Sequence, residues 1–198
     1  MEKNKEKLLV HACCAPCLVA VFDDIVANLQ EFGLQKVEDF DILWYNTNIH
    51  PKVEYERRKN TLKEYLNVVG KEGIFLDEYN MYGFIKNAVN YSDLGFRFRC
   101  EYCYFTRLKK VFEYAKDNGY TAVITTLLIS PYQKHDVIIE VCKKLEKEYG
   151  VRFLYKDFRP YFRAGQAKSR ELGLYRQKFC GCVFSIDESD YIMRKGLK

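Results

Sequence analysis

Residues 7–17 read Lys-Leu-Leu-Val-His-Ala-Cys-Cys-Ala-Pro-Cys, a short apolar run that leads directly into the start of a helix. The unbroken run over residues 7–13 is typical of a strand that is buried on both faces. Pro16 favours the first turn of a helix over residues 16–32, because the missing proline N–H needs no partner there, and Gly33 suits the C-cap. A buried strand followed at once by a helix is the repeating unit of an α/β fold.

The same alternation of strand and helix continues along the chain. We expect strands at residues 40–45, 74–79, 120–128 and 151–155, and helices at residues 53–69, 101–118 and 135–149. Residues 81–98 are aromatic and less regular, and residues 157–185 are basic, aromatic and irregular. The pattern predicts an α/β fold with a Rossmann-like (HUP-type), mostly parallel sheet flanked by helices, and a basic and aromatic C-terminal segment. Loops that follow parallel strands line the ligand crevice of such a sheet, so these loops should meet at one edge.

Composition excludes several classes of protein. The 198 residues, 48% of them apolar or aromatic, suffice for one domain with a real core over residues 1–198. With only 4 Pro and 11 Gly the chain is neither collagen-like nor of low complexity. No apolar run approaches the roughly 20 residues of a membrane helix, and the N-terminus lacks the features of a signal peptide, which predicts a cytoplasmic protein with no membrane partner. The net charge of +5 permits a nucleic-acid partner without requiring one.

Eight cysteines are many for a chain with no export signal. Seven of them fall into three groups, which are Cys13, Cys14 and Cys17, then Cys100 and Cys103, then Cys180 and Cys182. In a reducing compartment such groups indicate metal or redox chemistry more often than structural disulfides. Cys100 and Cys103 fall at the start of an expected helix, where the helix N-terminus would lower the pKa of both thiols. The spacing suits either an all-cysteine zinc site or an iron–sulfur cluster. Cys142, in the middle of a helix, is expected to be a small buried hydrophobe.

Two other functions are compatible with parts of this pattern. Cys14-Ala15-Pro16-Cys17, after a strand and at the start of a helix, matches the redox motif of a thioredoxin-like dithiol oxidoreductase. That function leaves Cys100, Cys103 and the Cys-Gly-Cys of residues 180–182 unexplained. A zinc-stabilised RNA-binding module is the second alternative.

Arginine and aromatic residues gather in residues 97–99, 159–163 and 175–179. Aromatic rings stack on unpaired bases and Arg or Lys binds phosphate, although each segment alone is equally well explained as a charged surface. Two of the three segments directly precede a cysteine group, which favours a functional role. Among the histidines, His50 lies in a polar turn and has the best case for function, whereas His11 is expected to be structural.

Five blocks of sequence carry a resemblance to a known family. They are His-Ala-Cys-Cys-Ala-Pro-Cys at 11–17, Tyr-Asn-Thr-Asn-Ile-His-Pro at 45–51 with Glu54 and Tyr55, Arg-Cys-Glu-Tyr-Cys-Tyr at 99–104, Thr-Thr-Leu-Leu-Ile-Ser-Pro-Tyr-Gln at 125–133, and Tyr-Arg-Gln-Lys-Phe-Cys-Gly-Cys at 175–182. Together they resemble the QueH-type epoxyqueuosine reductases, over about residues 7–185. Thr47 stands where proline is expected, and residues 96–98 replace a more glycine-rich lead into the first helical cysteine. Neither departure changes a candidate ligand residue.

The resemblance implies a catalytic domain for the last step of queuosine synthesis in tRNA, the reductive removal of the epoxide oxygen to leave a cyclopentene ring. It implies a [4Fe-4S] cluster bound by Cys13, Cys14, Cys100 and Cys103, with Cys180 and Cys182 as a redox-active catalytic pair. The expected partners are tRNA carrying epoxyqueuosine and an electron donor that the sequence does not identify. The candidate substrate-binding residues are Asn46, Asn48, His50, Tyr132, Gln133, Tyr175, Arg176 and Gln177. Residues 157–185 would be the substrate and redox segment.

The chemistry requires two electrons and two protons, and it releases water. A [4Fe-4S] cluster ordinarily passes one electron at a time, so a second group must hold the other electron or bind the oxygen. The Cys180 and Cys182 dithiol is a two-electron store whose small-ring disulfide should be easily reduced. Alternatively, Cys17, Cys180 and Cys182 could hold one additional iron ion beside the cluster as a Lewis acid. The sequence is compatible with both.

Overall fold

The computed structural model describes residues 6–92 and 95–185, and it confirms the predicted α/β fold. In this part of the chain five parallel strands form one sheet in the order β3-β2-β1-β4-β5. The strands are β1 (Leu8–His11), β2 (Phe40–Trp44), β3 (Gly73–Phe75), β4 (Ala122–Thr125) and β5 (Arg152–Phe153). The ends of the expected 1–198 domain lie outside the described residues, so that boundary stays a prediction.

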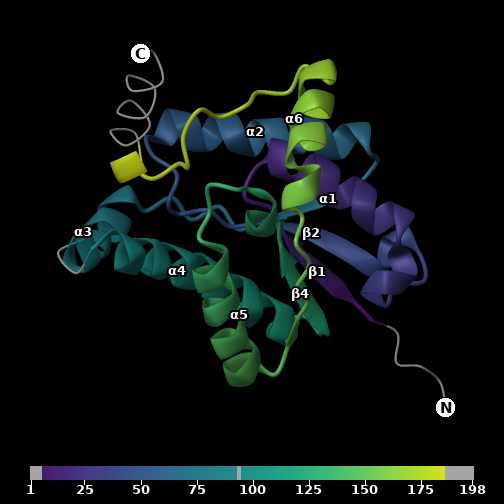
Figure 1. Cartoon of the computed structure of the whole chain (residues 1–198), viewed down its shortest axis with the longest axis horizontal. Helices are drawn as coiled ribbons and strands as arrows, with labels where there is room; N and C mark the ends of the chain where they lie inside the picture. The colour runs from purple at the N-terminus through teal and green to yellow at the C-terminus, as the bar shows by residue number, and fades with distance from the viewer. Residues whose placement is uncertain (1–5, 93–94, 186–198) are drawn as a thin grey trace.

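Helices cover both faces of the sheet. They are α1 (Ala15–Ala27), α2 (Lys52–Val68), α3 (Met81–Ser92), α4 (Phe96–Asp117), α5 (His135–Tyr149) and α6 (Phe162–Glu171). Figure 1 shows α1, α2 and α6 on one side and α4 and α5 on the other, with α3 packed on α4. No helix in the described ranges has the length and apolar character that a bilayer crossing needs.

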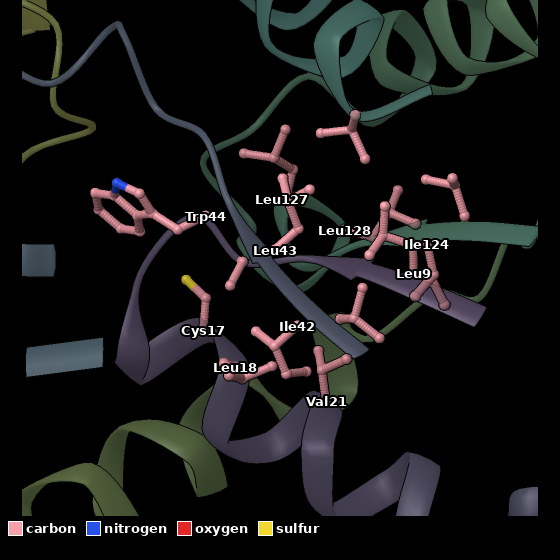
Figure 2. Packing of buried hydrophobic residues seen from close by; sticks show 14 of the residues in the cluster. Leu9, Cys17, Leu18, Val21, Ile42, Leu43, Trp44, Ile124, Leu127 and Leu128 are labelled. Atoms are coloured by element: carbon pink, nitrogen blue, oxygen red, sulfur yellow. The ribbon is translucent and has the colours of Figure 1, made fainter. Parts of the chain in front are cut away.

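The core lies on both faces of the central strand β1, whose four residues are all buried. Because side chains alternate along a strand, Val10 and Ile42, which are paired in the register, share one face of the sheet. Figure 2 shows Leu18 and Val21 of α1 directed toward Ile42 on that face. Each such buried side chain stabilises the fold by about 1.5–3 kcal/mol relative to exposure. The core therefore fixes β1 and α1, and with them the first cysteines, which lie in the turn between the two elements and at the start of α1.

Three segments differ from the sequence predictions. The stretch 81–98, expected to be irregular, contains α3 and the first turn of α4, because Phe84 and Ala88 form a buried face four residues apart that packs on α4. The irregular stretch 157–185 contains α6. The expected helix over residues 16–32 ends at Ala27, and a 3₁₀ turn completes it.

The strands are also shorter than predicted. The apolar run of residues 120–128 leaves the sheet after Thr125 and continues as a buried 3₁₀ helix, Thr126–Ile129. Strands β3 and β5 likewise occupy only part of the predicted 74–79 and 151–155. An apolar run marks burial rather than extended backbone, so it does not show where a strand ends.

Candidate active site

The candidate site lies at the carboxyl ends of β1 and β4, where the chain connections diverge to opposite faces of the sheet. The backbone N–H of Cys13, just after β1, donates to Thr126 Oγ1 at 2.9 Å, and the Thr126 hydroxyl donates to Cys13 Sγ at 3.2 Å. In an open α/β sheet such a divergence forms the ligand crevice. The predicted meeting of these loops at one edge is confirmed.

A first group of thiols surrounds the start of α1. The sulfurs of Cys13, Cys14 and Cys17 all lie within 4.8 Å of one another. This follows from the sequence, because Cys14 is the N-cap residue of α1 and Cys17 comes one turn later. Hydrogen bonds from Cys14, Cys17 and Thr126 lower the pKa of Cys13, whereas burial raises the pKa of Cys14. Of these three thiols, Cys13 is therefore the one that most readily loses its proton.

A second group of thiols lines a cavity of about 30 Å³ between α3, α4 and the C-terminal segment. Its lining residues are Phe84, Arg99, Cys100, Cys103, Tyr104, Gln133, Cys180, Cys182 and Phe184. The space suits a water molecule or an ion and is too small for a nucleobase. The structure thus brings Cys100 and Cys103 together with Cys180 and Cys182, the proposed redox pair.

The expected lowering of the pKa at Cys100 and Cys103 is wrong. Helix α4 begins at Phe96, so both residues lie beyond its first turn, where the influence of the helix N-terminus fades. Burial raises the pKa of Cys100 to about 11 and that of Cys103 to about 12. Without a metal, these two thiols are protonated near neutral pH.

The Cys180-Gly181-Cys182 loop is held by α2. Arg58 donates from Nη1 to the Cys180 carbonyl and from Nη2 to the Phe179 carbonyl, both at 3.1 Å. Glu54 accepts from Arg58 Nε at 2.7 Å and so keeps the guanidinium in place. At Gly181 the φ angle is +127°, and an added Cβ would lie 3.0 Å from Arg58 Nη1. Only glycine fits there without strain.

A model of the family described as epoxyqueuosine reductase QueH matches residues 8–188 of this sequence. This chain belongs to the QueH family. An epoxyqueuosine reductase QueH of Dehalococcoides mccartyi is 37% identical over 179 residues, covering 90% of this chain and 92% of the relative. One of Thermotoga maritima is 35% identical over 187 residues, covering 91% of each chain. The resemblance is therefore confirmed, and the chain is an oxidoreductase.

Three candidate substrate-binding residues of this QueH chain are buried, namely Asn46, Asn48 and His50. Asn46 Nδ2 donates to the Ala12 carbonyl at 2.9 Å. The His50 ring contacts Tyr79 and Phe84 in place of the expected polar groups. Burial lowers the pKa of His50 to about 4, so its ring is neutral near pH 7. These residues support the loops of the site from within the fold.

The other five candidates lie around the thiols or on the surface beside them. Gln133 donates from Nε2 to Cys180 Sγ at 3.4 Å, and Gln177 donates from Nε2 to Cys14 Sγ at 2.8 Å. The Tyr175 hydroxyl donates to Glu54 at 3.0 Å. Tyr132 is 84% exposed, and Arg176 is exposed as well. Both glutamines thus touch sulfur, one in each thiol group.

The predicted burial of His11 and of Cys142 is confirmed. The His11 ring lies in the core between Thr125 Oγ1 at 2.8 Å and the Tyr45 carbonyl at 3.2 Å, and burial lowers its pKa to about 4. Cys142 is fully buried on the sheet side of α5.

Sequence reasoning gave no role to two buried arginines, Arg58 and Arg107, that lie beside the thiols. Both occupy the interior of helices rich in lysine and arginine, where a charged side chain normally faces solvent. The one sequence signal is spacing, because Arg107 follows Cys103 by four residues, on the same helix face.

Proposed function

We propose that this chain removes the epoxide oxygen of epoxyqueuosine in tRNA, in a reaction that depends on an iron–sulfur cluster and completes queuosine synthesis. The observation that carries the proposal is that seven cysteines from three distant segments form two thiol groups in a QueH family member, one at the start of α1 and one lining a cavity beside α4. Reduction of an epoxide to an alkene consumes two electrons and two protons and releases one water molecule.

The donor set fits a thiolate-bound metal centre. Three sulfurs lie within 4.8 Å of one another, and four more thiols line one cavity. We assign Cys13, Cys14, Cys100 and Cys103 as the cluster ligands. When bound, a [4Fe-4S] cluster supplies electrons one at a time.

We propose that Cys180 and Cys182 take part in each catalytic cycle rather than in holding the cluster. Oxidation of the two thiols to a disulfide releases two electrons and two protons, which balances the removal of the oxygen as water; an external donor then reduces the disulfide. Cys180 is exposed, whereas Cys100 and Cys182 are half-buried and Cys103 is buried, so Cys180 is the thiol that substrate or donor reaches first. Gln133 donates from Nε2 to this sulfur at 3.4 Å and so helps to hold it at the mouth of the cavity. The alternative is that the pair, with Cys17, holds one additional iron ion.

The surface beside Cys180 suits RNA. Tyr132 is almost fully exposed and its ring meets Phe162 edge-on, with centroids 6.0 Å apart. The guanidinium of Arg57 lies over the Tyr175 ring, 4.0 Å from its centroid. Exposed aromatic rings stack on unpaired bases and arginines bind phosphate. We infer that the part of the tRNA that carries epoxyqueuosine lies across the surface formed by Tyr132, Phe162, Arg57 and Tyr175.

The dithiol alternative finds less support. Cys14 is 1% exposed and Cys17 is 5% exposed. Thiol–disulfide exchange requires access to the attacked sulfur, and neither sulfur is accessible. A reactive thiol also has a lowered pKa, whereas the pKa of Cys17 is raised. Zinc would also accept thiolate ligands, so metal analysis separates the zinc-stabilised module from the reductase.

The test is an anaerobic assay with tRNA that carries epoxyqueuosine, followed by mass spectrometry of the nucleosides. We expect reconstituted protein with a reductant to give a nucleoside lighter by one oxygen atom. Cys180→Ser and Cys182→Ser should retain the cluster and tRNA binding yet lose this activity, while Cys142→Ala retains all three. An unchanged epoxide together with disulfide reduction by the metal-free protein would support the dithiol alternative instead.

A further inference from the structure

Arg107 of α4 is a buried cation without a carboxylate partner among the described residues. Its exposed fraction is 2%, the same as that of Arg58. Arg58 has the carboxylate of Glu54 at 2.7 Å, as a buried guanidinium ordinarily requires. A buried charge with no counter-charge costs several kcal/mol, so the charge of Arg107 calls for an anion that the side chains do not provide.

The contacts of Arg107 leave one of its nitrogens without a partner. Its Nε donates to the Cys103 carbonyl at 3.3 Å, and its Nη1 to Asn46 Oδ1 at 3.4 Å. Asn46 in turn donates to the Ala12 carbonyl, next to Cys13. The buried Nη2 has no hydrogen-bond partner in the described part of the chain. Arg107 therefore links the turn of Cys103 to the turn of Cys13, through Asn46, and keeps an unused buried donor.

We propose that Arg107 is the fixed counter-cation of an anionic metal–thiolate centre that spans the Cys13 and Cys103 groups. This inference rests on the proposed iron–sulfur function. A cluster with four thiolate ligands carries a net negative charge, which matches the unpaired guanidinium and its free N–H. Arg107 is thus a positioning residue, because it acts by stabilising the metal–thiolate centre.

This placement has a consequence for stability. The unpaired buried charge of Arg107 destabilises the metal-free chain, and an anionic centre beside it stabilises the loaded one.

The test measures the melting temperature of each variant metal-free and after anaerobic iron and sulfide reconstitution. The readout is the increase on loading, because a ligand that binds only the folded state raises its stability. We expect Arg107→Gln to reduce this increase and Arg107→Lys to retain most of it. Asn46→Asp, which keeps the guanidinium but places a carboxylate beside it, should also reduce the increase. Lys59→Gln is the control, because Lys59 is another buried cation but is paired with Asp77 at 2.7 Å; it should lower both melting temperatures and leave the increase unchanged.

The outcomes separate the inference from the function on which it rests. Equal increases in wild type, Arg107→Gln and Asn46→Asp would overturn the role of Arg107 while leaving the cluster in place. A wild-type protein that takes up no iron would overturn the proposed function itself. If Arg107→Gln does not fold, Asn46→Asp and Arg107→Lys still give the comparison, because both retain a cation at residue 107.

Discussion

Single residues set the geometry of the loop that carries Cys180 and Cys182. Gly181 adopts a φ of +127° with Arg58, Ile49 and Asn48 close to the position of a Cβ. Arg58 binds the two carbonyls that precede it. The exposed thiol of Cys180 is therefore held by the backbone of its own loop, so small changes at residue 181 should move it.

Gly181→Ala tests this directly. An alanine at positive φ costs about 1–2 kcal/mol, and its methyl group would also push Arg58 or the loop aside. We expect a lower free energy of unfolding together with a loss of reductase activity of tenfold or more, which corresponds to about 1.4 kcal/mol in the barrier. Gly70→Ala is the control, because Gly70 has φ +66° and nothing within 4 Å of an added Cβ. It should lose comparable stability and keep its activity; equal activity losses in both variants would contradict the role given to the loop.

Tyr132 should contribute to tRNA binding rather than to stability. Its ring is 84% exposed, so Tyr132→Ala should change the free energy of unfolding by less than about 0.5 kcal/mol. Loss of one base-stacking contact costs about 1–3 kcal/mol, so we expect tRNA affinity to fall by roughly five- to 150-fold. Tyr82, 78% exposed on α3, provides the matched control. A filter-binding titration in which both variants bind tRNA equally well would show that the tRNA does not stack on Tyr132.

At the scale of elements, α6 connects the core to the C-terminal strip of residues 172–182. It packs across α1, and the contact is close because Gly165 and Ser169, one turn apart, are both small and buried. A Cβ at Gly165 would lie 2.9 Å from the Cβ of Ala20. The chain leaves α6 and passes directly to the residues that touch Cys14 and Arg58, so the position of α6 sets the position of the strip.

Gly165→Leu should therefore displace the strip of residues 172–182, although residue 165 lies outside it. Overpacking of a close contact costs about 1–3 kcal/mol, and the displaced helix would carry the strip away from the thiols. We expect a lower melting temperature and faster proteolysis after residue 171. Ala164→Leu, at the exposed neighbouring position, is the control. Unchanged proteolysis in Gly165→Leu would mean that α6 does not position the strip.

Local sequence correctly predicts those elements that a short run of neighbouring residues is enough to define. The apolar run of β1, Pro16 at the start of α1 and Gly150 after α5 all give the right structure, because burial and chain direction there depend on neighbouring residues. Helices α3 and α6 are different. Their buried faces consist of few or small residues, such as Phe84 and Gly165, and these become a packing surface only when another helix covers them.

The same distinction applies at the scale of the whole molecule. Strand order alone brings the turns after β1 and β4 to one edge, so the sequence predicts where the first cysteine group lies. It does not predict that Cys100 and Cys180 share a cavity, since that requires the path of the chain after α6. Nor does it predict that Arg107 is buried, because burial of a charge depends on the anion that it meets.

Anaerobic metal analysis with visible and EPR spectroscopy tests the central claim, a cluster held by cysteines from two distant segments, most directly. We expect brown protein with about four iron and four sulfide per chain, and additional iron would point to the second metal site. Cys13→Ser and Cys103→Ser should each lose the colour, and Cys142→Ala should keep it. Colourless protein with stoichiometric zinc, or a cluster that persists in both serine variants, would contradict the claim.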